Sequence, residues 1–355
     1  MELNSLLRQM MKQNASDLHL VTGAPPVFRI DGDLKADEGK KLRPEDTKSL
    51  VYSIMDNEKI SRFEKSHELD FSFGLSGAGR FRINVHFQRG SVGVAIRRIP
   101  DYAPTFAELN LPSILGELAL KRKGFILVTG PAGCGKSTTQ AAMVRIINEH
   151  RFAHIITLED PVEYLHSHKK SIVEQREVGS DTFSFGESLK RCLRQDPDVI
   201  LVGEMRDPET ISTAVTAAET GHLVLATLHT PGAAGAIDRI IDVFPSYQQS
   251  QIRAQLAGTL EAVIAQFLLP RKDDPGRVPA VELLIANSAV RNLIRSGKAH
   301  QLTTVMETGM RLGMRTMDQA LKELVDKDMV SYETAIVRVR NRTVFDKSLM
   351  YTMPG

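Results

Sequence analysis

The sequence predicts an α/β protein in which a core built on a parallel sheet follows a smaller α+β unit. Beyond residue 124, short apolar runs alternate with helical stretches, which is typical of a parallel sheet buried on both faces. Before residue 100, apolar and polar residues alternate one by one over three stretches, which indicates antiparallel strands with one buried face. Prolines at 100, 104 and 112 mark a linker between the two parts.

The length of 355 residues is enough for two or three domains. We expect an N-terminal domain over residues 1–99, a linker over 100–115, and a larger domain over 116–355 that ends in helices. In the N-terminal domain, periodicity predicts helices near 3–11 and 44–55, strands near 16–20 and 26–30, a hairpin turn at Asp31-Gly32, and meander strands near 69–75, 81–87 and 92–96.

The larger domain should begin with four buried strands, at 125–128, 155–158, 199–202 and 223–228, with a helix over 137–150 after the first. Further on, apolar residues at helical spacing from Ile252 to Phe267 predict another helix, and residues 281–285 a strand. Ser288 is the expected N-cap of a short helix that ends before Gly297, and Thr316 should cap the next helix.

One loop carries a specific chemical signal. It fits G-x-x-x-x-G-K-[ST], and it lies between a predicted strand and a predicted helix, as a phosphate-binding loop must. Its glycines let backbone N–H groups surround a phosphate, Lys136 can reach the β- and γ-phosphates, and the Ser137 hydroxyl can bind Mg²⁺. The expected nucleotide contacts are Gly130, Pro131, Ala132, Gly133, Cys134, Gly135, Lys136, Ser137 and Thr138.

Polar residues follow the other buried strands, at the edge where ligands of parallel sheets bind. Glu159 and Glu163 follow the second strand, Glu204 the third and His229 the fourth. Glu204 follows the buried strand that begins after Asp198, and this is the place where a carboxylate that activates the attacking water is expected. We therefore predict that Glu204 activates the water in ATP hydrolysis. Glu159 or Glu163 would orient the metal through water, and His229 would hydrogen-bond the γ-phosphate. His222, at a strand start, is equally consistent with capping or packing.

Composition excludes several classes of protein. The net charge is only +2, aromatic residues make up 6% and there is no Trp, so a nucleic-acid partner is not expected, although a local basic patch remains open. Two cysteines, Cys134 and Cys192, cannot form a disulfide framework or a four-thiolate zinc site. The sequence contains no signal peptide pattern and no apolar run that could span a bilayer, so we expect no direct membrane insertion.

Several segments resemble the secretion and type IV pilus ATPase family. Residues 159–164 (EDPVEY) are similar to its acidic box, residues 194–198 with 203–207 to its second NTPase motif, and residues 220–230 (TGHLVLATLHT) to its histidine box. Residues 15–26 are similar to its N-terminal signature, so the resemblance extends over nearly the whole chain. Within the family the pilus-retraction motors are the most similar, because residues 289–296 resemble their A-I-R-N-L-I-R-E motif, with departures at Val290 and Ser296.

The resemblance implies a RecA-like core, a PAS-like N-terminal domain and a homohexameric ring that uses ATP and Mg²⁺. It implies retraction of type IV pili through an inner-membrane platform protein, at the cytoplasmic face of the inner membrane. It also implies that arginines of the N-terminal domain close over the phosphates; Arg80, Arg82 and Arg97 are the candidates. Taken alone, these arginines are most simply a solvated sheet face.

Three alternatives remain. Pilus-extension and type II secretion ATPases resemble the core, but they typically carry a four-cysteine zinc module and extra N-terminal domains. An accessory paralogue that works beside the retraction motor is the second alternative, and a ring-shaped DNA translocase is a remote third. The short helix with Arg291 and Arg295 bears on retraction. A purely structural helix would bury Leu293 and Ile294 and leave both arginines in water, whereas the resemblance suggests a coupling surface.

Overall fold

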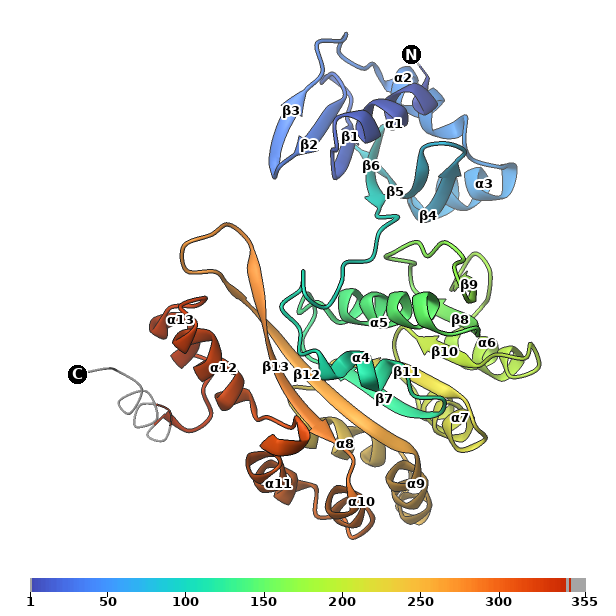
Figure 1. The fold of residues 1–355 in the computed structure, drawn as a ribbon. Helices are drawn as coiled ribbons and strands as arrows, with labels where there is room; N and C mark the ends of the chain where they lie inside the picture. The colour runs from blue at the N-terminus through green and yellow to red at the C-terminus, as the bar shows by residue number, and fades with distance from the viewer. Residues whose placement is uncertain (1, 343–344, 346–355) are drawn as a thin grey trace. The chain divides into compact units, whose positions relative to one another are not determined.

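The computed structural model describes residues 2–342 and 345, and Figure 1 shows the order of the elements. The chain divides into two compact units. The N-terminal unit runs to Tyr102 and includes Glu163–Leu165; the larger unit comprises Ala103–Val162 and the described residues from His166 onward. The expected domain limits at residues 99 and 116 remain a proposal.

The N-terminal unit is a mixed α+β structure around one antiparallel sheet of order β3-β2-β1-β6-β5-β4. Its elements are α1 (Leu3–Lys12), β1 (Asp17–Leu20), β2 (Val27–Ile30), β3 (Asp33–Ala36), α2 (Pro44–Tyr52), α3 (Asn57–Ser66), β4 (Glu68–Leu75), β5 (Gly79–Gln88) and β6 (Ser91–Ile99).

The predicted meander and hairpin in this unit are confirmed. Asp31 and Gly32 both have positive φ, 51° and 92°, as a two-residue hairpin turn between twisted strands requires. Helix α3 was not expected, since its sequence is mostly polar and buries only Phe63. That ring stacks on Phe87 at 4.8 Å between centroids, and Ile60 of the same helix also packs against the core, so these apolar contacts hold the helix on the sheet.

The larger unit is built on a seven-stranded sheet of order β13-β12-β7-β11-β10-β8-β9, in which only β13 runs antiparallel to its neighbour. Its strands are β7 (Gly124–Thr129), β8 (His154–Glu159), β9 (Ile172–Glu177), β10 (Val199–Val202), β11 (Leu223–Leu228), β12 (Leu260–Pro270) and β13 (Arg277–Ile285). The helices are α4 (Ile114–Ala119), α5 (Lys136–His150), α6 (Phe185–Cys192), α7 (Pro208–Glu219), α8 (Ala233–Asp242), α9 (Ser246–Thr259), α10 (Ser288–Arg295), α11 (Leu302–Thr308), α12 (Met317–Asp326) and α13 (Tyr332–Ile336).

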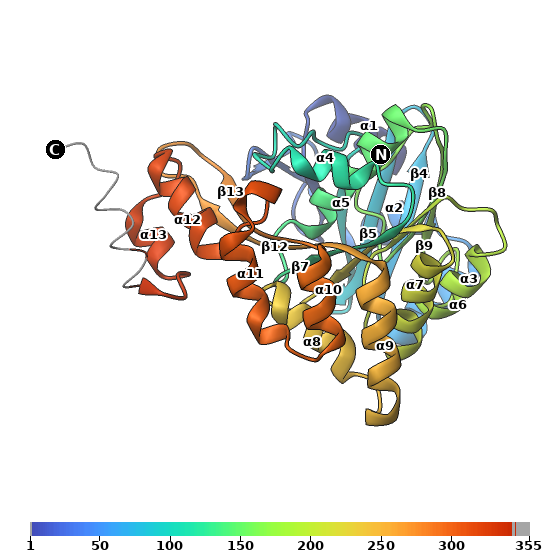
Figure 2. The same cartoon turned by 60° about the horizontal axis from the view of Figure 1, so that its bottom comes forward.

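Helices cover both faces of this sheet, as the continuous apolar strands require. One face packs against α4, α5 and the segment from Phe106 to Leu111, while the other packs against α6 to α11 (Figures 1 and 2). All four predicted core strands are confirmed, and their parallel register aligns their carboxyl ends at one edge. This edge holds the residues that the sequence singled out.

Two expectations about the last third of the chain are wrong. The helix expected to reach Phe267 ends at Thr259, and residues 260–270 form strand β12. This strand lies between β13 and β7 with both faces largely buried, so its apolar run has no period of two that would distinguish it from a helix. The N-cap of α10 is Asn287, whose side chain accepts from the Val290 amide, so Ser288 is the first helical residue.

Candidate nucleotide-binding site

The phosphate loop leaves β7 and enters α5, and its glycines are required by geometry. Gly130, Gly133 and Gly135 all have positive φ, at 141°, 72° and 88°. A Cβ at Gly130 would lie 2.4 Å from the carbonyl oxygen of Gln266, so no larger residue fits there without moving β12. The loop therefore holds its backbone amides and the positive end of α5 toward one point, which suits an anion.

Lys136 places a positive charge at the centre of this loop. The side chain is 8% exposed, and its Nζ donates to the carbonyl oxygens of Gly130 at 2.9 Å and Pro131 at 3.1 Å. Ser137, the next residue, is half-buried in the first turn of α5. The ammonium and the hydroxyl are thus adjacent at a helix N-terminus, the arrangement expected for a phosphate and its metal.

Gln266 of β12 braces the loop, and sequence reasoning missed this residue because it lay within the supposed helix. Its amide Nε2 donates to the Cys134 carbonyl at 2.6 Å, and its Oε1 accepts from the Thr139 hydroxyl at 2.9 Å. The side chain is 1% exposed. Cys134 itself is a free, buried thiol whose pKa is raised by desolvation, which makes it unreactive as a nucleophile.

A cavity adjoins the loop on the side of β12 and β13. Its volume is about 350 Å³, within the range of ligand pockets. Arg277 of β13 lies on its wall and donates to the Gly133 carbonyl at 3.4 Å. The lining residues are Glu108, Leu109, Leu111, Gly135, Thr138, Thr139, Gln266, Leu268, Gly276, Arg277 and Pro279. An apolar wall beside a phosphate loop suits the base and sugar of a nucleotide.

Glu204 and His229 are brought together at the same edge of the sheet. The strands β7, β11, β10 and β8 are successive neighbours in the sheet, and each carries one of these groups at its carboxyl end. The phosphate loop follows β7, His229 follows β11, Glu204 follows β10 and Glu159 ends β8. One carboxylate oxygen of Glu204 lies 3.2 Å from His229 Nε2. Such strands are about 4.8 Å apart, so the histidine stands between the acid and the loop.

Arg206 holds the other carboxylate oxygen of Glu204, and sequence reasoning assigned this arginine no role. Its Nη2 lies 2.6 Å from Glu204 Oε2. This hydrogen bond, together with the charge of His229 when protonated, lowers the pKa of Glu204 despite its partial burial. The side chain is therefore a carboxylate at neutral pH.

Backbone contacts fix the positions of these strand ends. The Gly203 amide donates to the Leu158 carbonyl at 2.7 Å, and the Met205 amide to the Thr227 carbonyl at 3.1 Å. The hydroxyl of Thr227 donates in turn to the Gly203 carbonyl. His222 lies at the opposite end of β11, where its Nδ1 donates to the Ala217 carbonyl at 2.8 Å. It therefore caps α7, which favours the capping interpretation.

The other two carboxylates occupy different settings. Glu159 accepts from the Thr157 hydroxyl at 2.6 Å and from the Gln175 amide at 3.2 Å. Glu163 is exposed and belongs to the N-terminal unit. Within the described residues, no group of three His, Cys, Asp or Glu side chains forms a metal site. The Ser137 hydroxyl beside Lys136 nevertheless fits Mg²⁺, which commonly takes most of its ligands from phosphates and water.

The three arginine candidates lie on β5 and β6 of the N-terminal unit. Arg82 and Arg97 are both exposed and directly opposite each other across the two strands, an arrangement of like charges that is unfavourable unless anions compensate it. Arg97 Nε donates to Asp17 at 2.7 Å, and Arg82 lies 3.8 Å from Asp70. Arg80 lies two residues from Arg82 and is half-buried.

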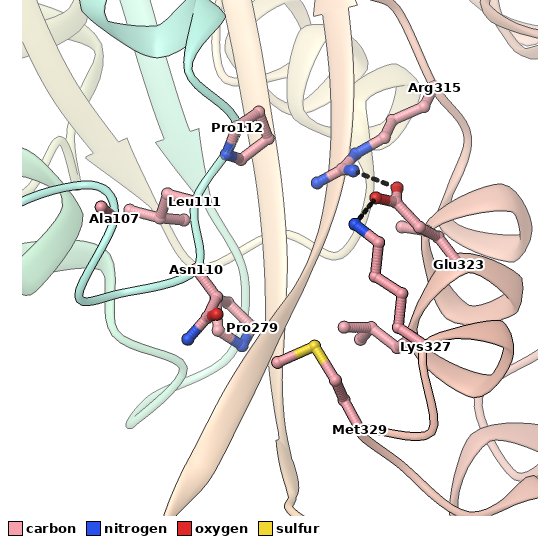
Figure 3. A pocket seen from close by; sticks show the side chains of 11 residues that line it. Ala107, Asn110, Leu111, Pro112, Pro279, Arg315, Glu323, Lys327 and Met329 are labelled. Carbon is pink, nitrogen blue, oxygen red and sulfur yellow. Dashed lines mark hydrogen bonds and ion pairs between the residues drawn. The ribbon is translucent and has the colours of Figure 1, made fainter.

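A second cavity in the larger unit has a different character (Figure 3). It has a volume of about 320 Å³ and lies between the segment Ala107–Pro112, Pro279 and helix α12. Glu323 bridges Arg315 at 2.8 Å and Lys327 at 2.6 Å across its wall. Both cations are already paired with this one carboxylate, and the cavity contains no residue of the phosphate loop, so we assign it no role in nucleotide binding.

The chain is similar to several known proteins over nearly its whole length. A family model described as type II/IV secretion system protein matches residues 1–345. The chain is 46% identical over 335 residues to the type IV pilus retraction ATPase PilT of Pseudomonas aeruginosa, covering 94% of this chain and 97% of that protein. It is 43% identical to the type IV pilus ATPase PilU of the same organism, covering 95% and 88%. A crystal structure of the pilus retraction motor PilT with bound ADP superimposes with a TM-score of 0.90 and 47% identity, covering 98% and 99% of the two chains.

Proposed function

Since the chain belongs to the type II/IV secretion system protein family, we propose that it is an ATPase that drives the retraction of type IV pili. The observation that carries this proposal is the near full-length similarity to a retraction ATPase, at 46% identity. The alignment of the phosphate loop, His229 and Glu204 along one sheet edge independently supports the ATPase part of this proposal. The expected substrates are ATP and water, and the expected products are ADP and phosphate.

Binding would use the loop and the adjoining cavity. The loop amides and Lys136 would hold the β- and γ-phosphates, while the cavity beside Thr138 would receive the sugar and base. Bound Mg²⁺ would neutralise charge on the β- and γ-phosphates, with the Ser137 hydroxyl as its protein ligand. Glu159 or Glu163 would orient the metal through water.

In hydrolysis, Glu204 would orient the attacking water and accept its proton. The water oxygen forms a bond to the γ-phosphorus as the bond from phosphorus to the β–γ bridging oxygen breaks. Because its pKa is lowered, Glu204 is ionised and ready to accept a hydrogen bond from water. His229, now 3.2 Å from this carboxylate, would turn to the γ-phosphate and so report its presence.

Arginines of the N-terminal unit would complete the site. Arg82 and Arg97 lie opposite each other on two strands. Each is already beside an acid, Asp70 and Asp17 respectively, and an approaching triphosphate would compete with these acids for the two cations. Arg80 is the third candidate. An arginine supplied in this way stabilises the charge that develops on the phosphate in the transition state.

We further propose a homohexamer that acts on an inner-membrane platform protein at the cytoplasmic face of the inner membrane. Across residues 2–342 and 345, no helix has both the length and the apolar character of a bilayer span. A membrane position would therefore depend on partners or on surface contacts.

A second candidate function is that of an accessory paralogue beside a main retraction motor. The 43% identity to PilU favours keeping it, since it is close to the 46% identity to PilT. A pilus-extension or type II secretion ATPase is disfavoured, because the sequence has two cysteines and cannot supply a four-cysteine zinc module.

The test combines a deletion strain with the purified protein. Deletion should abolish twitching motility, and the pure protein should hydrolyse ATP only with Mg²⁺. Glu204→Gln should retain ATP binding, lose about 10²–10⁴-fold in turnover and fail to restore motility. Normal motility of the deletion strain would argue for the accessory role, and near-normal turnover of Glu204→Gln would move the base to Glu159 or Glu163.

A further inference from the structure

A cluster of basic side chains gathers at the end of the sheet opposite to the nucleotide edge. Three short connections meet there: residues 121–123 before β7, 151–153 between α5 and β8, and 168–171 before β9. We call them the basic edge. Its cations are Lys121, Arg122, Lys123, Arg151, Lys169 and Lys170.

Hydrogen bonds hold these three connections together. Arg151 Nη1 donates to the Lys121 carbonyl at 2.8 Å, and the Ser171 hydroxyl donates to the Arg151 carbonyl at 2.7 Å. The Lys170 amide donates to the Asn148 carbonyl at 3.0 Å, which ties the third connection to the last turn of α5. The basic edge is therefore one built surface and not three unrelated loops.

Acidic neighbours compensate only part of this charge. Lys121 pairs with Glu261 at 2.6 Å, and Lys169 pairs with Glu149 at 2.6 Å. Arg151 is attracted electrostatically by Asp198. Arg122, Lys123 and Lys170 are exposed, and in the described part of the chain they have no ion pair. With a net charge of only +2 for the whole chain, three uncompensated cations in one place are a local feature.

Exposed apolar side chains lie within the same surface. Phe152, at the centre of the middle connection, is 87% exposed, and Ile172, which follows the third, is 58% exposed. The Ile172 amide donates to the Ala153 carbonyl at 2.9 Å, so the backbone of Ile172 lies beside the residue that follows Phe152. Burying an aromatic ring is favourable, and leaving Phe152 in water forgoes that gain.

We propose that the basic edge binds the surface of an anionic lipid bilayer, with Phe152 entering the headgroup region. Lysines and arginines attract anionic lipids, and an adjacent aromatic side chain anchors at the interface. Four of the six cations are lysines, a residue type depleted at protein–protein interfaces, which favours a lipid surface over a protein partner. Because the nucleotide motifs lie at the other ends of the strands, lipid and ATP would bind this unit together.

The test is co-sedimentation of the full-length protein with vesicles at about 0.1 M salt, where charges still interact over about 10 Å. The wild type should bind vesicles of phosphatidylglycerol and phosphatidylethanolamine and not vesicles of phosphatidylcholine alone. The variant R122Q/K123Q/K170Q should bind about 10- to 100-fold more weakly, since each lost cation weakens binding several-fold. Phe152→Ser should also weaken binding while leaving the thermal unfolding midpoint unchanged.

The matched control is K35Q/K40Q/K41Q, which removes the same charge from exposed positions of the N-terminal unit. It should bind the anionic vesicles as the wild type does. Equal loss in this control would show a non-specific charge effect and overturn the proposal. Failure of the wild type to bind, as expected if the edge docks an acidic protein or a nucleic acid instead, or equal binding to phosphatidylcholine vesicles, would also overturn it.

Discussion

At the scale of the residue, Glu204 is held between Arg206 and His229, and the contact with Arg206 influences its protonation most. The hydrogen bond from Arg206 is the largest cause that lowers the pKa of Glu204 below its usual value of 4.5. A lowered pKa keeps the carboxylate ionised as the pH falls, and so preserves its ability to bind and orient water.

Arg206→Ala should therefore move the acid limb of the turnover–pH profile to higher pH. Without the arginine, the pKa of Glu204 rises, so the carboxylate is protonated earlier on acidification and activity is lost at a higher pH. Near neutral pH the carboxylate is ionised in both proteins, and the difference should shrink. The measurement is ATP turnover from about pH 3.5 to pH 7, which includes the ordinary titration of a glutamate at about pH 4.3. The control is Arg191→Ala, which breaks an exposed pair with Glu187. If the acid limbs of Arg206→Ala and the wild type coincide, Glu204 is not the group that titrates.

At the scale of the element, the phosphate loop depends on β12 for its shape. Gln266 satisfies both the Cys134 carbonyl and the Thr139 hydroxyl with the donor and the acceptor of one amide, which among the other residue types only the shorter Asn also carries. Removing the amide leaves two buried polar groups without their partner, at a cost of about 1–3 kcal/mol each.

Gln266→Leu should thus weaken ADP binding by about 10-fold or more, because the loop loses the brace that preorganises it. Gln266→Glu should retain the acceptor for Thr139 but set a carboxylate oxygen against the Cys134 carbonyl, so it should also bind weakly. The measurement is calorimetric titration with ADP, with thermal unfolding run in parallel. Gln255→Leu, which loses only an exposed contact with Glu219, is the control. Unchanged ADP affinity in Gln266→Leu would show that the loop forms without the brace.

Helix α10 separates its two arginines, contrary to the expectation that a structural helix leaves both in water. Arg291 donates to the Ala257 carbonyl at 2.7 Å and the Gly258 carbonyl at 3.0 Å, and pairs with Glu261 at 3.2 Å. It therefore fixes α10 to the end of α9. Arg295 is exposed, Ile294 is buried and Leu293 is half-buried.

Charge reversal should consequently have different effects at the two positions. Arg291→Glu should destabilise the protein by several kcal/mol, since it loses charged hydrogen bonds worth about 1.5–3 kcal/mol each and places a second acid beside Glu261. Arg295→Glu should leave unfolding and ATP turnover unchanged but abolish twitching, if α10 contacts the pilus machine. Denaturation, ATPase and motility assays on both variants decide this. Normal motility with Arg295→Glu would remove this residue from the coupling surface.

The elements that could be predicted from the sequence are those whose pattern is typical of one kind of structure only. The phosphate loop is predicted by a specific motif between a strand and a helix, and its glycines have the positive φ angles that the loop requires. The core strands are predicted because their apolar runs are short and bounded. Strand β12 was mistaken for a helix because a run buried on both faces has no distinguishing period, and Gln266 was lost with it. Arg206 was missed because its role depends on a 2.6 Å contact that spacing alone does not predict.

At the scale of the whole molecule, the larger unit includes residues that the sequence assigned to the linker. Phe106 and Leu111 are buried in the core on the same face of the sheet as α4 and α5. A fragment that starts at Gly116 would therefore lose part of this core, whereas one that starts at Ala103 keeps it. The fragment from Ala103 onward is thus the appropriate one for asking whether the N-terminal unit contributes to catalysis.

We expect this fragment to bind ADP as the full chain does but to hydrolyse ATP poorly, because it lacks Arg80, Arg82 and Arg97. A single arginine supplied to the transition state can be worth about 10³–10⁵ in rate, and the loss here should be smaller if the three share the task. Arg82→Gln in the full chain tests one of them without removing the unit, and Arg82 is preferred to Arg97 because the latter also neutralises the buried Asp17. Turnover and sedimentation should be measured together, since a fragment that no longer assembles could lose activity for that reason alone. Full activity in both the assembled fragment and Arg82→Gln would show that these arginines take no part in catalysis and only form a solvated face of the sheet.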